Sequence, residues 1–147
     1  MRPSYYHWFF LIQPDGLPER LIQQSAEYYI KEILKRWSAP GTTFSDEAVS
    51  EYLRCFTSPD TIHTTCEDYR AGASIDLEHD EQDLGRQLSW PLLVLWGAKG
   101  FVQRQYDVIE IWQQYADQVV GRMIDCGHFL PEEKPAEVQQ SLLAFFK

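Results

Sequence analysis

The chain has 147 residues, 44% of them hydrophobic and 14% aromatic, so it is about one domain long and can bury a core. Its formal net charge of -9 repels phosphate backbones, which disfavours nucleic-acid binding. The three cysteines are an odd number at irregular spacing, so we expect no disulfide framework and a reduced, cytoplasmic setting.

The first part of the sequence predicts a series of short helices. Tyr5 to Gln13 predicts one helix, with Pro3 suited to a first helical turn and Pro14 ending it. Its apolar run is too short for a membrane span and no small-residue cleavage site follows, so we expect neither a span nor a signal peptide. Further helices are expected to begin near Pro18, Ser25, Ser45 and Ser58.

Two later stretches of this part have distinct expected environments. Ile62, Cys66, Tyr69 and Ala73 recur at helical spacing, which predicts one buried helix face. The acidic stretch 76–85 is instead typical of a solvated helix face.

The second part of the sequence changes to strand and helix in alternation. The run LLVLWG, residues 92–97, predicts a strand buried on both faces, and 119–127 predicts a second strand. Helices are expected over 106–116 and from Pro135 onward. This order predicts an α/β protein with a parallel sheet.

Two strands are too few for a stable parallel sheet, because such sheets need both faces covered and several strands. The segment YYHWFFLI, residues 5–12, is also apolar nearly all round, so it is suited to burial on more than one side. The chain therefore either oligomerises or forms the C-terminal part of a larger protein, and we favour the second interpretation.

His128 is the first candidate for chemistry. It follows the second predicted strand and Gly127, and histidine at the carboxyl end of a parallel strand faces the crevice where α/β proteins bind ligands. The ordinary alternative is a loop histidine with a hydrogen-bonded ring. No Gly-x-Ser-x-Gly or Gly-x-Asp-x-x-Gly turn supplies a nucleophile, and Cys126 is too near in sequence to form a productive pair with His128.

Other polar and aromatic groups give weaker signals. His63, Cys66 and His79 lack a second pair at ligand spacing, so we expect no metal and assign them to core or solvated positions. Several hydrogen-bond donors on apolar side chains would suit a dry anion site if they converged, although each is also suited to core packing. These donors are His7, Trp8, Trp37 and Tyr69.

Four segments carry a family resemblance: YYHWFFLIQP, IHTTCEDYRAGASIDLEHD, PLLVLWGAKGFV and CGHFLPEEKP. In this order they resemble the haloacetate (fluoroacetate) dehalogenases of the α/β-hydrolase fold, which are relatives of the soluble epoxide hydrolases. The resemblance covers essentially the whole chain. It implies a mostly helical cap over residues 1–88, followed by a β-α-β-α end of the parallel core sheet over residues 89–147.

The resemblance also implies a mechanism. In the family, an aspartate displaces the halide and forms an ester, which water activated by a histidine then hydrolyses. His128 matches that base, while His7, Trp8 and Tyr69 match the donors that stabilise the leaving halide. Trp37 is a weaker candidate for lining the pocket. No cofactor is implied.

The departures from the family are as informative as the matches. The family's aspartate nucleophile and its substrate-binding arginines lie upstream of the matching region. The segment AKGFV, residues 98–102, holds no acid where many hydrolases place the one that orients the histidine. In the haloacetate branch that acid instead precedes the cap, so the resemblance implies that it too is missing. We therefore expect no dehalogenase turnover from this chain alone.

Two other interpretations stay open. In an epoxide hydrolase-like protein, Tyr69 would protonate the opening oxygen. Alternatively, the chain is a non-catalytic helical module that forms a homodimer. In the complete hydrolase we expect a small haloacetate-like substrate, and neither a nucleic acid nor a membrane as partner.

Overall fold

The computed structural model describes residues 6–147, so the predictions for Pro3 and Tyr5 lie outside the described residues. The chain divides into two compact units. The first comprises residues up to Ile33 together with Phe44–Leu84, and the second comprises Leu34–Thr43 together with Gly85–Lys147. The expected cap and core meet at residue 88, close to the division at residues 84 and 85. The separate grouping of Leu34–Thr43 was not expected from the sequence.

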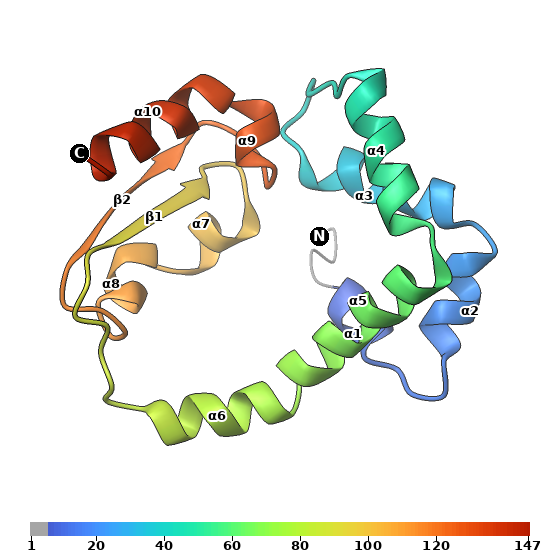
Figure 1. Ribbon diagram of the computed structural model, residues 1–147, viewed down its shortest axis with the longest axis horizontal. Coiled ribbons are helices and arrows are strands. Elements are labelled where there is room, and N and C mark those ends of the chain that lie inside the picture. Colours follow the sequence, from blue (N-terminus) through green and yellow to red (C-terminus); the bar gives the residue numbers. More distant parts are fainter. Residues whose placement is uncertain (1–5) are drawn as a thin grey trace. The chain divides into compact units, whose positions relative to one another are not determined.

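The first unit is helical, as the sequence predicts. Ser45 and Ser58 accept hydrogen bonds from the backbone amides of Ala48 and Thr61, both at 3.1 Å, which confirms the two predicted helix starts. The helices are α1 (Tyr6–Leu11), α2 (Leu17–Gln23), α3 (Ala26–Trp37), α4 (Asp46–Phe56), α5 (Pro59–Gly72) and α6 (Ile75–Asp83) (Figure 1). The last turn of α3 belongs to the second unit.

The core of the first unit lies where α1 and α2 pack against α5. Leu11, Ile22, Ile62 and Cys66 are buried there, and Tyr69 packs against them. This arrangement confirms the predicted buried face of α5 at Ile62, Cys66 and Tyr69. The prediction is wrong for Ala73, which is exposed because α5 ends one residue earlier, at Gly72. All residues of α6 are exposed, which confirms the solvated acidic face.

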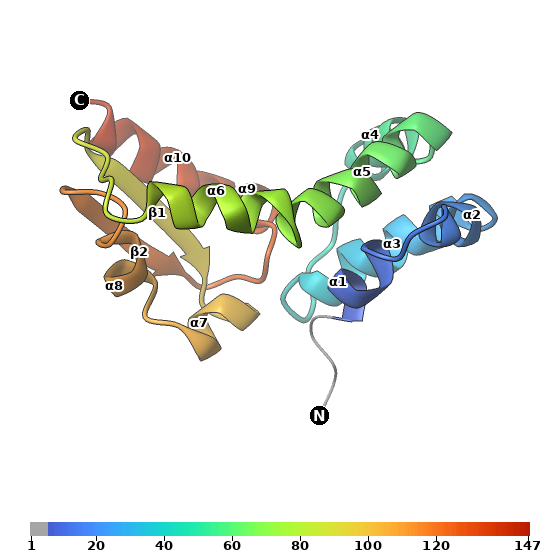
Figure 2. The ribbon, with the colours of Figure 1, turned by 90° about the horizontal axis from the view of Figure 1, so that it is seen from below.

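The second unit is built on two parallel strands. β1 (Leu92–Gly97) pairs with β2 (Val119–Ile124) in register from Leu92 opposite Val119 to Gly97 opposite Ile124. The unit also contains α7 (Phe101–Gln105), α8 (Val108–Trp112), α9 (Leu130–Glu133) and α10 (Pro135–Phe145). Within this unit, α10 runs along one side of the sheet and α8 along the other (Figures 1 and 2).

Two elements of the second unit differ from the prediction. The helix expected over 106–116 is shorter. α8 begins at Val108, because Asp107 caps its start by accepting a hydrogen bond from the Glu110 amide, and it ends at Trp112. The second strand ends at Ile124 rather than at residue 127. Beyond it, the Gly127 amide donates to the Glu133 carboxylate and the His128 amide donates to the Trp37 carbonyl oxygen.

The strands are less buried than the sequence predicts. In β1 only Val94 and Gly97 are buried, and most of β2 is exposed. Large apolar side chains around this sheet are also exposed, among them Trp90 at 66% and Met123 at 55%. The described part of the chain does not cover its own sheet, which agrees with the C-terminal portion of a larger α/β fold. No helix in residues 6–147 is long and apolar enough to cross a membrane.

Candidate functional site

His128 lies in the loop that follows β2, as the sequence predicts. Its backbone N–H donates to the Trp37 carbonyl oxygen at 2.9 Å. Its ring meets the Trp37 ring edge to face, with centroids 5.0 Å apart, and lies at 5.2 Å from the Phe129 ring. The loop therefore places the imidazole beside two aromatic rings, while the residue as a whole is exposed.

The surroundings of His128 favour a neutral imidazole. Partial burial of the ring lowers the pKa of His128 from its ordinary value, and the negative charge of Glu133 raises it in part. The net shift is downward, so the ring is mostly unprotonated at neutral pH. A neutral, solvent-accessible imidazole is suited to accept a proton from water.

Close backbone approaches shape this loop. A Cβ atom on Gly127 would lie 2.4 Å from the Ala39 nitrogen and 2.6 Å from the Trp37 carbonyl oxygen. A Cβ atom on Gly97, at the end of β1, would lie 1.8 Å from the Gly127 carbonyl oxygen. The glycine before His128 thus allows three backbone segments to meet, rather than only a tight turn.

The structure adds Glu133 to this loop, a residue that sequence reasoning did not single out. Its carboxylate accepts hydrogen bonds from the amides of Gly127 and Phe129, on either side of His128, at 2.8 and 3.1 Å. It also accepts from the Ala39 amide at 2.9 Å and the Thr42 hydroxyl at 3.1 Å. The only sequence signal was its place in a Pro-Glu-Glu helix start, which does not predict such distant partners.

Three of the predicted halide donors come together in the first unit. His7 is buried, and its ring lies 5.7 Å from the ring of Tyr69 in an edge-to-face contact. The Trp8 and Tyr69 rings are 4.9 Å apart, also edge to face, and Trp8 packs over Gly72. α1 and α5 thus gather imidazole, indole and phenol groups into one aromatic cluster. Trp37, the fourth candidate, lies beside His128 in the second unit.

Two of the three cysteines, Cys66 and Cys126, have surroundings unsuited to nucleophiles. Cys126 and Cys66 have no exposed surface, and burial raises the pKa of both thiols, that of Cys66 to about 11. Both therefore stay protonated at neutral pH, and the protonated thiol is a poor nucleophile. This agrees with the expectation that Cys126 does not pair with His128.

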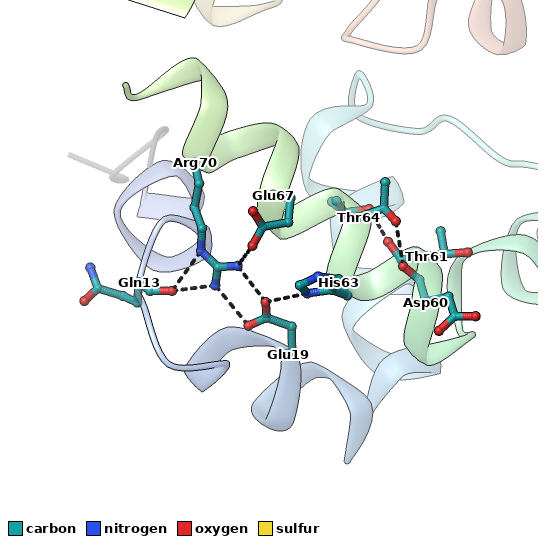
Figure 3. Close-up of polar contacts among 9 residues, drawn as sticks. Gln13, Glu19, Asp60, Thr61, His63, Thr64, Glu67 and Arg70 are labelled. Atoms are coloured by element: carbon teal, nitrogen blue, oxygen red, sulfur yellow. Dashed lines mark hydrogen bonds and ion pairs between the residues drawn. The ribbon is translucent and has the colours of Figure 1, made fainter. Parts of the chain in front are cut away.

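A charged network joins α2 to α5 in the first unit (Figure 3). Arg70 donates to both carboxylate oxygens of Glu19, at 2.8 and 3.1 Å, and to Glu67 at 2.5 Å. Glu19 also lies 3.3 Å from His63. The hydrogen bonds from Arg70 outweigh burial and lower the pKa of Glu19 to about 2.

This network bears on metal binding. Glu19, His63 and Glu67 offer ligand atoms within 4.8 Å of one another. The Arg70 guanidinium already holds both carboxylates, and its positive charge opposes a cation at the same place. The metal grouping considered from the sequence does not form, because Cys66 is in the core and His79 is on the exposed α6. An open groove of about 650 Å³ lies over the network, and no member of the aromatic cluster lines it.

Comparison with known proteins places this chain beside two groups of hydrolases. It is 34% identical over 143 residues to a fluoroacetate dehalogenase from Burkholderia sp, covering 97% of this chain and 47% of the relative. It is 32% identical over 132 residues to a soluble epoxide hydrolase from Corynebacterium sp. (strain C12), covering 86% of this chain and 43% of the relative. The chain thus spans about half the length of these relatives. No protein-family model matches it.

Solved structures show the same relationship. A protein from Nostoc sp PCC 7120 assigned to the α/β-hydrolases superposes with a TM-score of 0.94 at 53% identity, over 98% of this chain and 50% of its own. A protein from Pseudomonas aeruginosa assigned as an epoxide hydrolase superposes with a TM-score of 0.86 at 40% identity, over 97% and 48% of the two chains.

Proposed function

Because this chain belongs to the α/β-hydrolases, whose C-terminal half it spans, we propose that it supplies the water-activating base and the halide-stabilising donors of a haloacetate dehalogenase. The observation that supports this most is His128, a neutral and accessible imidazole held on the loop after β2. The aromatic cluster of His7, Trp8 and Tyr69 supports it independently.

The proposed reaction has two displacements. An aspartate carboxylate, outside these 147 residues, forms a C–O bond to the halogen-bearing carbon as the C–halogen bond breaks and halide leaves. His128 then takes a proton from water, and the resulting hydroxide adds to the ester carbonyl. As that adduct collapses, the proton passes from His128 to the leaving alkoxide oxygen, which releases the hydroxy acid, frees the aspartate carboxylate and restores neutral His128.

The donors have a specific part in the first displacement. Fluoride is a poor leaving group, so hydrogen bonds that strengthen as negative charge develops lower the barrier. The Trp8 indole N–H, the Tyr69 hydroxyl and an imidazole N–H of His7 are donors of the required kind. Trp37 contributes differently in this proposal, because it packs against the base and lines the space beside it.

The partner in this proposal is the nucleophile-bearing half of the same fold. The continuous apolar sequence of β1 suits an interior strand, yet among the described residues it pairs only with β2. Its free edge and the exposed apolar side chains around it are where further strands of the core would pack. No Gly-x-Asp-x-x-Gly turn occurs in the 147 residues, so we expect the isolated chain to be inactive.

The test is complementation. The purified chain is assayed for fluoride release from fluoroacetate, alone and after co-folding with the N-terminal portion of the Burkholderia dehalogenase that this chain does not match. Size-exclusion chromatography establishes whether the two halves associate. We expect release only from the associated halves. Sustained release by the chain alone, or none from a well-formed complex, would contradict the proposal.

Epoxide hydrolysis is the second candidate, supported by the similarity to the Corynebacterium enzyme. There the Tyr69 hydroxyl would donate a proton to the opening epoxide oxygen. The same associated halves, offered styrene oxide in place of fluoroacetate, distinguish the two activities. A homodimeric, non-catalytic module would instead show a cooperative melt and a dimer by chromatography, without turnover of either substrate.

A further inference from the structure

Glu133, at the end of α9, accepts hydrogen bonds at both carboxylate oxygens from four donors. Two of the donors are the backbone amides of Gly127 and Phe129, which directly precede and follow His128. The other two are the Ala39 amide and the Thr42 hydroxyl, in a segment far away in the sequence. One carboxylate therefore ties the loop that carries His128 to residues 39–42.

Hydrogen bonds hold the backbone on both sides of His128 as well as at His128 itself. The His128 N–H donates to the Trp37 carbonyl oxygen, so the three consecutive amides of residues 127–129 are all held. A histidine whose own amide and both flanking amides are bonded has little freedom to shift along the loop. The backbone thus fixes the position from which the ring packs against Trp37 and Phe129.

The hydrogen bonds that Glu133 accepts are strongest when its carboxylate is charged. Burial raises the pKa of Glu133, but the hydrogen bonds from Gly127, Ala39, Phe129 and Thr42 together outweigh it, and the net pKa lies below the usual range. Glu133 is therefore ionised at neutral pH, and bonds to an ionised acceptor are stronger than neutral ones. Among the described residues, Glu133 is also the charged group that shifts the pKa of His128.

The segment that Glu133 holds has a particular place in the chain. Residues 34–43 belong to the second unit but connect two stretches of the first, which end at Ile33 and resume at Phe44. The backbone of Gly127 also lies close to the backbone of Ala39 and Trp37, so the loop and residues 37–39 are packed together independently of any side chain. Within the second unit, the loop that carries His128 and residues 39–42 are thus held by the same carboxylate.

We propose that Glu133 is the positioning residue of His128, a carboxylate that sets the imidazole by holding its flanking amides against residues 39–42 of the same unit. The assignment of His128 as base rests on the proposed function. The hydrogen bonds that Glu133 accepts from the loop do not depend on that assignment, so their role can be tested on the chain without turnover.

The experiment follows His128 by NMR in the isolated chain and in Glu133→Gln, Glu133→Asp and Glu132→Gln variants. Glu133→Gln keeps the shape but loses the charge and turns one acceptor into a donor. Glu133→Asp keeps the charge but shortens the reach by one methylene. Glu132→Gln removes the neighbouring exposed carboxylate of α9 and serves as the matched control.

Two readouts decide the proposal. Glu133→Gln should lower the pKa of His128 and speed hydrogen exchange of the Gly127, Phe129 and Ala39 amides by roughly tenfold or more. Glu133→Asp should speed exchange while changing the pKa less, and Glu132→Gln should change neither comparably. Unchanged exchange and unchanged His128 titration in Glu133→Gln would overturn the proposal.

A measurement on the unaltered chain covers the case in which Glu133→Gln fails to fold. The amide shifts of Gly127, Ala39 and Phe129 should titrate together with the Glu133 carboxyl, at one pKa below the usual range for glutamate. If these amide shifts do not change with pH, or change at a pKa different from that of the Glu133 carboxyl, the proposal is overturned. In the associated halves, Glu133→Gln should lower kcat and shift the acid limb of the pH–rate profile to lower pH. Absence of turnover in the unaltered complex would contradict the proposed function, but it would not affect the NMR test of the role of Glu133.

Discussion

The His128 backbone amide and the Trp37 carbonyl oxygen form a 2.9 Å hydrogen bond, and the rings of the same two residues meet edge to face. Backbone and side chain of His128 are thus both anchored to the C-terminal end of α3. The proposed base is held by a helix whose sequence shows no sign of that role. Gly127 permits this contact, because it has no side chain to meet the backbone of residues 37–39.

Gly127→Ala should disrupt the packing of the loop that carries His128 against the backbone of residues 37–39. The added Cβ would lie within 2.4–2.6 Å of backbone atoms of residues 37–39, so the segments must separate. We expect a loss of free energy of unfolding on the order of 2 kcal/mol, measured by chemical denaturation. Gly100→Ala is the control, because its Cβ would approach the Gly97 carbonyl oxygen only to 3.1 Å. Equal stability of the two variants would contradict this account.

His128→Gln should separate the two displacements in the associated halves. The glutamine cannot take a proton from water, so the ester should form and persist. We expect one equivalent of fluoride per complex, then release slower by about 10²–10⁴-fold, with a covalent adduct visible by mass spectrometry. The control is His79→Gln on the exposed α6. Unimpaired steady turnover by His128→Gln would exclude His128 as the base.

In the unaltered complex, the second displacement should depend on pH through the same residue. His128 must be unprotonated to act, so the rate should rise with pH and level off above its pKa. Because that pKa is lowered, the midpoint should lie below the ordinary histidine value of about 6.5. A pH–rate profile checks this, and a midpoint well above that value would argue against the surroundings described for the ring.

Tyr69→Phe should distinguish a hydroxyl donor from an aromatic packing residue. The ring contacts with His7 and Trp8 do not need the hydroxyl, so the fold should persist. Loss of one donor to a developing anion costs about 10²–10³-fold in rate, measured as fluoride release by the associated halves. Tyr28→Phe, at an exposed position, is the control. Full activity in Tyr69→Phe would reduce Tyr69 to a packing role.

Glu19→Gln should destabilise the first unit, and acid should have the same effect. Because the pKa of Glu19 is lowered to about 2, its contribution to stability is full above its unfolded pKa near 4.5 and is lost as pH falls toward 2. We expect Glu19→Gln to cost roughly 1–3 kcal/mol near pH 7. The cost should shrink through that acid range, as followed by urea denaturation.

Glu51→Gln is the matched control for that experiment. Glu51 also pairs with an arginine and also has its pKa lowered to about 2. Its side chain is 59% exposed, however, against 8% for Glu19, so solvent screens the pair. The control should change stability little at any pH. A comparable loss in both variants would show that burial does not set the strength of the Glu19–Arg70 pair.

Local sequence patterns predicted much of the first unit. Ser45 and Ser58 start α4 and α5 because each side chain bonds an amide three residues away. The buried face of α5 follows from helical spacing alone. The start of α8 and the end of β2 were less predictable, because a side-chain cap sets the first and hydrogen bonds to distant partners accompany the second.

The sequence by itself determined the helices, the two parallel strands, the family resemblance and His128 as the candidate base, since these depend on neighbours or on motifs read along the chain. Only the tertiary structure brought Trp8 to Tyr69, Arg70 to Glu19, and Trp37 and Glu133 to His128. The physical reason is distance along the chain. A carboxylate has the same letter in the sequence whether it faces water or holds three backbone amides, and only the folded chain brings those amides within hydrogen-bonding reach.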